Sequence, residues 1–184
     1  MKKLLLLTGD LAAGKSSFAD ILSKRYDTPY FYKDSIKELL GDTIGFSNRE
    51  ENLKLSRAAV DLMIFAFAEL AKSGRDLILE ANFRTPELER LQTLARENGY
   101  DVLTAVFRGD LEILYGRYMN RIRNENRHPV HVSTGLNEFS DFKEYLERAR
   151  QETVPGNTVC INADDFSYQT DEELLSKIDR FMLD

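Results

Sequence analysis

Residues Gly9 to Ser16 carry the strongest chemical signal in the chain, because they read Gly-Asp-Leu-Ala-Ala-Gly-Lys-Ser, a complete G-x-x-x-x-G-K-S loop. The apolar run Leu4–Leu7 precedes the loop and a helical stretch from Ser16 to about Tyr26 follows it, which is the context that a phosphate-binding loop requires. Its glycines let backbone N–H groups fold around an anion, and the helix N-terminus adds partial positive charge. We expect Lys15 to reach the β- and γ-phosphates as a catalytic residue, and the Ser16 hydroxyl to bind Mg²⁺. The predicted nucleotide-binding residues are Gly9, Asp10, Leu11, Ala12, Ala13, Gly14, Lys15, Ser16 and Ser17.

Two carboxylates follow stretches that are expected to be strands. Asp34 comes after the aromatic segment that ends at Tyr32, and Glu80 ends the apolar run Leu77–Leu79. Asp34 could accept a proton from a substrate hydroxyl as a general base, and it could also cap the helix that follows. Glu80 occupies the position of a strand-end carboxylate that holds Mg²⁺ through water, although capping of a loop would also suit it. We therefore predict catalysis by Asp34 and a metal site made of Ser16 and Glu80.

Arginines gather in a third region of the chain, where four lie within eleven residues: Arg117, Arg121, Arg123 and Arg127. The first two are one helical turn apart and share a face. Pro129 breaks the helix, so we expect an arginine-rich lid over about residues 122–136 that includes His128 and His131. A planar guanidinium pairs two phosphate oxygens at once. We predict nucleotide contacts for Arg117, Arg121 and Arg127, with Arg121 also catalytic, whereas Arg123 suits a solvated face equally well.

The acceptor side of the reaction has weaker signals. The segment Asn82-Phe83-Arg84 places a polar, an aromatic and a basic residue on the loop after Glu80. We expect these three residues, with Lys33 and Asp34, to bind the acceptor, although Phe83 on its own would also suit the core. The long helix expected over about Asn48 to Lys72 carries no substrate motif and forms the remaining wall.

Strands and helices alternate along the chain. Apolar runs predict strands at Lys3–Thr8, Pro29–Lys33, Asp76–Glu80, Asp101–Phe107 and Thr158–Ile161. Helices are expected between them, with Thr85 and Asp110 as N-caps and with Thr170-x-x-Glu173 as a capping box for the last helix. This alternation predicts an α/β fold with a five-stranded parallel sheet and helices on both faces. Since ligands bind beyond the carboxyl ends of such strands, the phosphate loop, Lys33-Asp34, Glu80 to Phe83 and Asn162 to Asp165 should line one crevice.

Composition limits the partners. The 184 residues suit one domain over 1–184, with 42 % hydrophobic and 30 % charged residues. The net charge of −6 speaks against binding to long nucleic acid. No apolar stretch is long enough to span a membrane, so we expect a cytoplasmic protein, monomeric or homodimeric. The single cysteine, Cys160, excludes an intrachain disulfide and is expected to be a buried thiol.

The phosphate loop, the Lys33-Asp34 pair, the stretch Leu79-Glu80-Ala81-Asn82-Phe83 and the lid arginines, in this order, resemble the P-loop small-molecule kinases related to polynucleotide kinase and chloramphenicol phosphotransferase. The resemblance covers about Lys3 to Val132. It implies a three-layer P-loop fold with sheet order 2-3-1-4-5, ATP as the nucleotide, Asp34 as the base and Arg121 on the ATP phosphates. It also implies that Asn162 to Asp165 lie near the adenine. Glu80 departs from the aspartate usual in this family.

These observations predict an ATP- and Mg²⁺-dependent kinase that transfers the γ-phosphoryl group to a hydroxyl of a small molecule. Candidate acceptors are a nucleoside or nucleotide, a 5′-hydroxyl end, an antibiotic or a sugar. One alternative is a nucleotide-binding regulatory ATPase without an acceptor, which would switch by closing its lid. Another is a kinase of nucleic-acid ends, which the net charge disfavours. A GTPase is disfavoured because the chain lacks an N-K-x-D motif.

Overall fold

A computed structural model describes residues 2–124, 127–132 and 135–184. Its centre is a five-stranded, all-parallel sheet in the order β2-β3-β1-β4-β5. The strands are β1 (Lys2–Gly9), β2 (Tyr30–Tyr32), β3 (Leu77–Glu80), β4 (Tyr100–Arg108) and β5 (Thr158–Asn162). The predicted fold class and strand order are confirmed.

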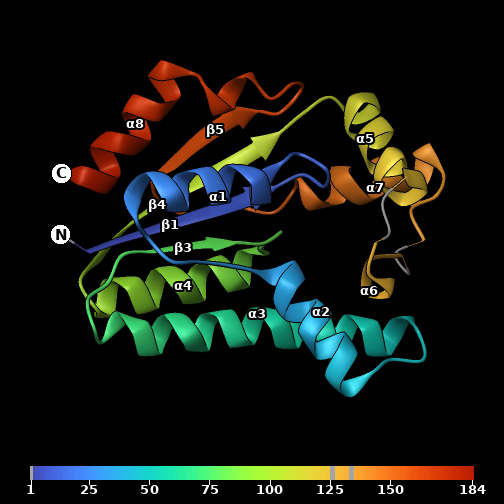
Figure 1. Cartoon of the computed structure of the whole chain (residues 1–184), viewed down its shortest axis with the longest axis horizontal. Coiled ribbons are helices and arrows are strands. Elements are labelled where there is room, and N and C mark those ends of the chain that lie inside the picture. The colour runs from blue at the N-terminus through green and yellow to red at the C-terminus, as the bar shows by residue number, and fades with distance from the viewer. Residues whose placement is uncertain (1, 125–126, 133–134) are drawn as a thin grey trace.

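Eight α-helices connect and follow the strands in the described residues (Figure 1). They are α1 (Lys15–Tyr26), α2 (Lys33–Ile44), α3 (Arg49–Ala71), α4 (Thr85–Glu97), α5 (Leu111–Asn124), α6 (Pro129–Val132), α7 (Phe139–Ala149) and α8 (Glu172–Leu183). A 3₁₀ turn, Ser167–Gln169, precedes the last helix. None of the described helices is both long and apolar enough to cross a lipid bilayer.

The leucine run of β1 shows why the sheet needs a helical layer on each face. Successive side chains of a strand point to opposite faces. Accordingly, Leu4 and Leu6 belong to a core with α3 and α4, and Leu5 and Leu7 belong to a core with α1 and α8. All four are fully buried. Figure 1 shows the resulting layers, with α3 and α4 on one side of the sheet and α1 and α8 on the other.

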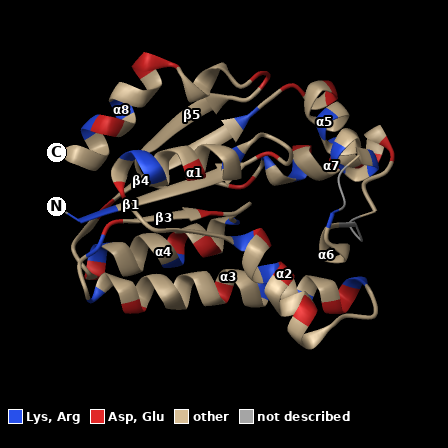
Figure 2. Cartoon of the chain, viewed as in Figure 1, with Lys and Arg blue, Asp and Glu red and all other residues tan. Residues whose placement is uncertain are grey.

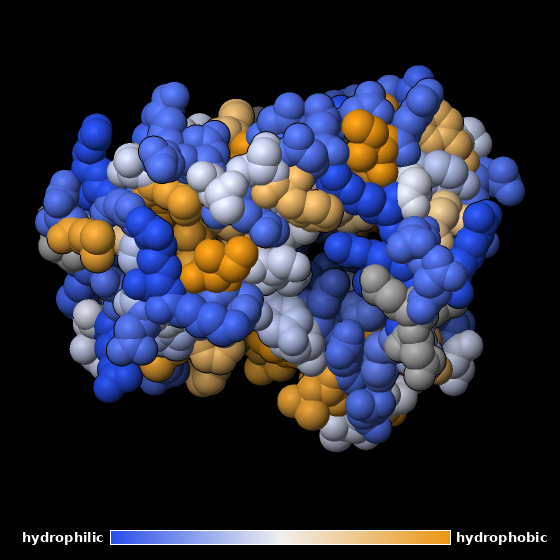
Figure 3. Space-filling model, turned by 45° about the horizontal axis from the view of Figure 1, so that its top comes forward, coloured by the Kyte–Doolittle hydropathy of each residue, from blue (hydrophilic) through white to orange (hydrophobic). Residues whose placement is uncertain are grey.

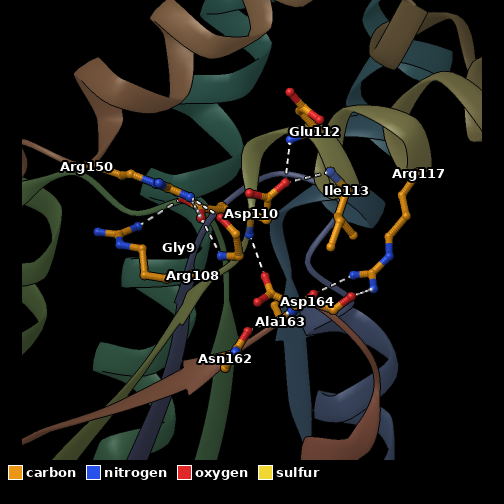
Figure 4. Close-up of polar contacts among 12 residues, drawn as sticks. Gly9, Arg108, Asp110, Glu112, Ile113, Arg117, Arg150, Asn162, Ala163 and Asp164 are labelled. Atoms are coloured by element: carbon orange, nitrogen blue, oxygen red, sulfur yellow. Dashed lines mark hydrogen bonds and ion pairs between the residues drawn. The ribbon is translucent and has the colours of Figure 1, made fainter.

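Two predicted helix starts are displaced by one residue. The cap of α8 is Asp171 rather than Thr170, and its carboxylate accepts hydrogen bonds from the backbone N–H groups of Glu173 and Leu174. The cap of α4 is Arg84 rather than Thr85. In both places two neighbouring polar residues compete for one cap, and the tertiary path of the chain decides between them. Asp110, by contrast, caps α5 as expected, through the N–H groups of Glu112 and Ile113 (Figure 4).

The expectation of a buried Cys160 is wrong, because this residue is exposed. It lies on β5, an edge strand that pairs only with β4. Its neighbour Ile161 takes the position that faces the core. Strand alternation then turns the cysteine to the open side of the sheet edge.

Candidate active site

The phosphate loop joins β1 to α1 and depends on two glycines. Gly9 has a φ of +118°, and a Cβ atom there would stand 2.2 Å from the carbonyl oxygen of Phe107 on β4. Gly14 has a φ of +83°, and a Cβ there would stand 2.4 Å from the hydroxyl of Tyr168. Only glycine meets both the conformational and the steric demand at these positions. The loop motif is therefore fixed by its backbone geometry and by its neighbours in the fold.

Lys15 and Ser16 begin α1 and contact groups at the ends of the neighbouring strands. The Ser16 Oγ donates a hydrogen bond of 2.8 Å to Glu80 Oε2, at the end of β3. Lys15 is buried, and its Nζ donates to the Asp10 carbonyl oxygen at 2.6 Å. Burial lowers the pKa of Lys15, and the carboxylates of Glu80 and Asp34 oppose that shift. The loop lysine thus lies in the field of two carboxylates that are distant in sequence.

Asp34 joins these residues because of the strand register. Tyr32 of β2 and Leu7 of β1 both stand level with Glu80 on β3. Asp34 follows two residues after Tyr32, so its carboxylate comes to the same edge of the sheet, where it is exposed to solvent. Burial raises the pKa of Glu80; Lys15 opposes this shift and Asp34 adds to it. Three separate segments therefore bring their charges together here.

A cleft of about 640 Å³ opens from this point. It is lined by Leu11 to Ser17 of the loop and α1, by Lys33 and Asp34, by Glu80 and Asn82, and by Arg84, Arg121 and Arg127. Figure 3 shows the surface hollowed right of centre, with hydrophilic residues around the hollow. Most of the residues predicted from sequence therefore surround one cavity.

Four predicted sites lie outside this cleft. Phe83 is buried in the core beside α3 and α4, where its backbone N–H donates to Thr8 Oγ1 at 3.0 Å. The Arg117 guanidinium donates to the carbonyl oxygens of Ala163 and Asp164 at 2.6 and 2.5 Å (Figure 4). It also lies over the Phe166 ring. Gly9 forms the end of β1.

Asp10 is the fourth predicted site residue outside the cleft, because its carboxylate is buried among arginines. Asn162 to Asp165, expected in the same crevice, also do not line it. Their strand, β5, is at the far edge of the sheet from β2 and β3. The placement of these residues near an adenine stays a prediction.

The acceptor wall is richer than the sequence indicated. Helix α3 turns five residues of one face into the cleft: Asn52, Leu53, Ser56, Arg57 and Val60. Its first residue, Arg49, lines the cleft too, as do Lys37, Glu87, Tyr118, His131, Leu136 and Tyr145. Polar residues repeating every three or four positions along an otherwise apolar helix were the available signal for the α3 face. No sequence signal separated Tyr145 of α7 from an ordinary core residue.

Basic residues dominate the cleft away from the phosphate loop. Figure 2 shows lysine and arginine on α2, at the N-terminal end of α3 and on α5. Arg84 forms a 3.2 Å ion pair with Glu152, which occupies part of its guanidinium. Arg49 and Arg57 make no ion pair within the described residues. The cleft therefore holds positive charge in a chain whose net charge is −6.

Oxygen atoms beside the phosphate loop are suitable ligands for a divalent cation. The Ser16 hydroxyl and the Glu80 carboxylate are already in contact, and hard oxygen ligands are those that Mg²⁺ prefers. Within residues 2–124, 127–132 and 135–184, no group of three or more His, Cys, Asp or Glu side chains is placed to hold a metal. An Mg²⁺ ion at this site would accordingly depend on nucleotide phosphates and water for its other ligands.

Comparison with known proteins supports the fold. A protein from Chloroflexus aurantiacus J-10-fl that is described as a presumed kinase is 25 % identical to this chain. Its structure gives a TM-score of 0.83 and covers 100 % of this chain and 99 % of that one. The tunicamycin resistance protein of Deinococcus radiodurans gives a TM-score of 0.64 at 17 % identity, covering 97 % and 96 % of the two chains. A gluconokinase from Sinorhizobium meliloti 1021 gives 0.61 at 14 % identity, covering 98 % and 94 %. A comparison with curated protein sequences found no match.

These likenesses and the site geometry agree with the resemblance to P-loop small-molecule kinases, and they support a phosphotransferase. The family model described as Zeta toxin matches residues 1–173, which is nearly the whole chain. The protein therefore belongs to the Zeta toxin family of P-loop kinase-like proteins.

Proposed function

We propose that this protein transfers the γ-phosphoryl group of MgATP to a hydroxyl of a small acceptor that carries an anionic group of its own. The observation that carries the proposal is the meeting of Lys15, the Ser16–Glu80 pair and Asp34 at one end of a cleft that continues to α3. A protein that only hydrolyses a nucleotide needs no second, built wall beyond its phosphate loop. The continuation of the cleft supports a second substrate.

Each group has a role that its position favours. Lys15, Arg121 and Arg127 line the same cleft as the phosphate loop and would stabilise charge on the transferred phosphoryl oxygens. Ser16 and Glu80 would hold Mg²⁺, which when bound neutralises charge on the phosphates. Asp34 would accept the proton of the attacking hydroxyl. Its exposure at the edge of the cleft leaves its carboxylate accessible to an acceptor.

The basic wall supports an anionic acceptor. Lys33, Lys37, Arg49 and Arg57 line the part of the cleft formed by α2 and α3. Opposite charge raises the local concentration of a ligand and fixes its orientation, and arginine forks suit carboxylate and phosphate oxygens. A neutral sugar or antibiotic would leave Arg49 and Arg57, which make no ion pair within the described residues, without an anionic partner. Sugar acids, sugar phosphates and nucleotides fit the wall best.

Matched acceptor pairs test this proposal. ADP release from MgATP is measured with glucose against gluconate and glucose 6-phosphate, and with nucleosides against their monophosphates. We expect stimulation by an anionic member of a pair. Asp34→Asn should lower acceptor-dependent turnover by about 10²- to 10⁴-fold while ADP still binds, because the variant loses the general base. Asp61→Asn, an exposed carboxylate of α3 that pairs with Arg90, is the matched control.

The outcomes separate the parts of the proposal. Equal stimulation by the neutral member of a pair would contradict the preference for an anionic acceptor, but it would still support a kinase. Retention of normal turnover by Asp34→Asn would remove Asp34 as the base. Tight nucleotide binding with no response to any acceptor would favour a regulatory nucleotide switch instead.

A further inference from the structure

A buried carboxylate inside the phosphate loop is held by two arginines from outside the loop. The Asp10 side chain is 0 % exposed. It accepts hydrogen bonds from Arg150 Nε and Nη2 at 3.2 and 2.6 Å, from Arg108 Nη1 at 3.1 Å and from the Gly109 N–H at 3.1 Å. Figure 4 shows the two arginines converging beside Gly9. The position is a variable one in the loop motif, so the motif does not require a carboxylate there.

The backbone of the same residue supports the catalytic lysine. The Asp10 N–H donates to the Phe107 carbonyl oxygen at 3.0 Å. Its own carbonyl oxygen accepts the hydrogen bond from Lys15 Nζ at 2.6 Å. The carboxylate that Arg150 holds and the carbonyl that receives Lys15 are thus a few bonds apart. Movement of Asp10 would move the group that positions the lysine.

Arg150 connects this loop to two helices whose residues also line the cleft. It caps the C-terminal end of α7. The same helix turns Tyr145 into the cleft, and its Phe142 ring packs 5.3 Å from the Tyr118 ring of α5. Helix α5 also carries Arg121. One bidentate ion pair therefore joins the phosphate loop to the body that presents Tyr145 and Arg121.

We propose that Arg150 is a positioning residue, which sets the phosphate loop and Lys15 against α5 and α7 through the carboxylate of Asp10. The proposal rests on the phosphoryl transfer proposed above. Stability alone does not explain the cluster, because a buried ion pair gains little over well-packed apolar side chains of the same volume. Such a pair does fix geometry, and a displacement of about 1 Å at a reacting group can cost about 10²-fold in rate.

The test compares Arg150→Met, Arg150→Lys and Asp10→Asn in the full chain. MgADP binding is measured by calorimetry, and kcat and KM for MgATP are measured by acceptor-independent hydrolysis. We expect Arg150→Met to lower kcat by at least about tenfold and to weaken MgADP binding, with Arg150→Lys recovering part of the loss. In the Asp10→Asn background, Arg150→Met should have less than a third of its effect in the wild type, because the two side chains act as one unit.

Arg25→Met is the matched control, because Arg25 also makes a bidentate pair with a carboxylate, Asp179, remote from the cleft. It should lower the melting temperature without changing kcat or MgADP binding. If Arg150→Met lowers only the melting temperature and keeps kcat and MgADP binding within twofold of wild type, the cluster is structural and the inference is overturned. If Arg150→Met does not fold, Arg150→Lys and Asp10→Asn decide by the same criteria. Absence of MgADP binding by the wild type would instead overturn the proposed function.

Discussion

Lys37 should make the stability of this protein rise with pH in alkaline solution. The residue lies on α2 and is only 6 % exposed, and its Nζ donates to the Val130 carbonyl oxygen at 2.9 Å. Burial lowers the pKa of Lys37 from 10.5 to about 8, with Lys33 adding to the shift and Asp34 opposing it. The folded state therefore disfavours the charged ammonium that the unfolded chain keeps.

The sign and size of the effect follow from proton linkage. Between pH 8 and pH 10.5 the unfolded chain binds the Lys37 proton and the folded chain does not, so the free energy of unfolding rises with pH. The full shift of the pKa corresponds to a gain of about 3 kcal/mol in the free energy of unfolding, and about 2 kcal/mol of this gain falls between pH 7 and pH 10. Lys37→Met lacks this proton and should lack the rise. The Asn52 amide also donates to Val130, at 3.1 Å, so the carbonyl keeps a partner in the variant.

Urea unfolding of the wild type and of Lys37→Met at intervals from pH 7 to pH 10 measures the difference directly. The wild type should gain about 2 kcal/mol relative to the variant across this range. Lys24→Met removes a lysine whose side chain is 75 % exposed and controls for changes in the unfolded chain. A difference between wild type and Lys37→Met that stays constant with pH would refute the argument from burial.

Two further substitutions test the centre of the site. Glu80→Gln should abolish most phosphoryl transfer and raise the melting temperature of the nucleotide-free protein at pH 7. Burial raises the pKa of Glu80, so its charge lowers the stability of the folded state as the pH rises above the pKa of this group in the unfolded chain. A lower melting temperature would contradict this. Gly14→Ala should weaken MgADP binding by at least about tenfold in calorimetry, because of the positive φ and because its Cβ would meet Tyr168 and Phe166 at 2.4 and 2.8 Å. Unchanged affinity would show that the loop adapts at no cost.

The local parts of this site could be predicted from sequence. The phosphate loop is eight consecutive residues between a strand and a helix, and its anion-binding geometry arises from neighbouring backbone groups. The alternation of strands and helices also indicated the parallel sheet. Since ligands bind at the carboxyl ends of parallel strands, the sequence alone predicted that Asp34 and Glu80 lie close to the loop.

Only the tertiary structure decided which other side chains reach the cleft. Cys160 is exposed because β5 is an edge strand, and Phe83 is buried because α3 and α4 cover its side of the sheet. The face that α3 turns inward depends on how that helix packs, which no local pattern fixes. Arg150 meets Asp10 across 140 positions of sequence. Short-range backbone preferences are thus written in the sequence, whereas contacts between distant side chains exist only once the helical layers have packed on the sheet.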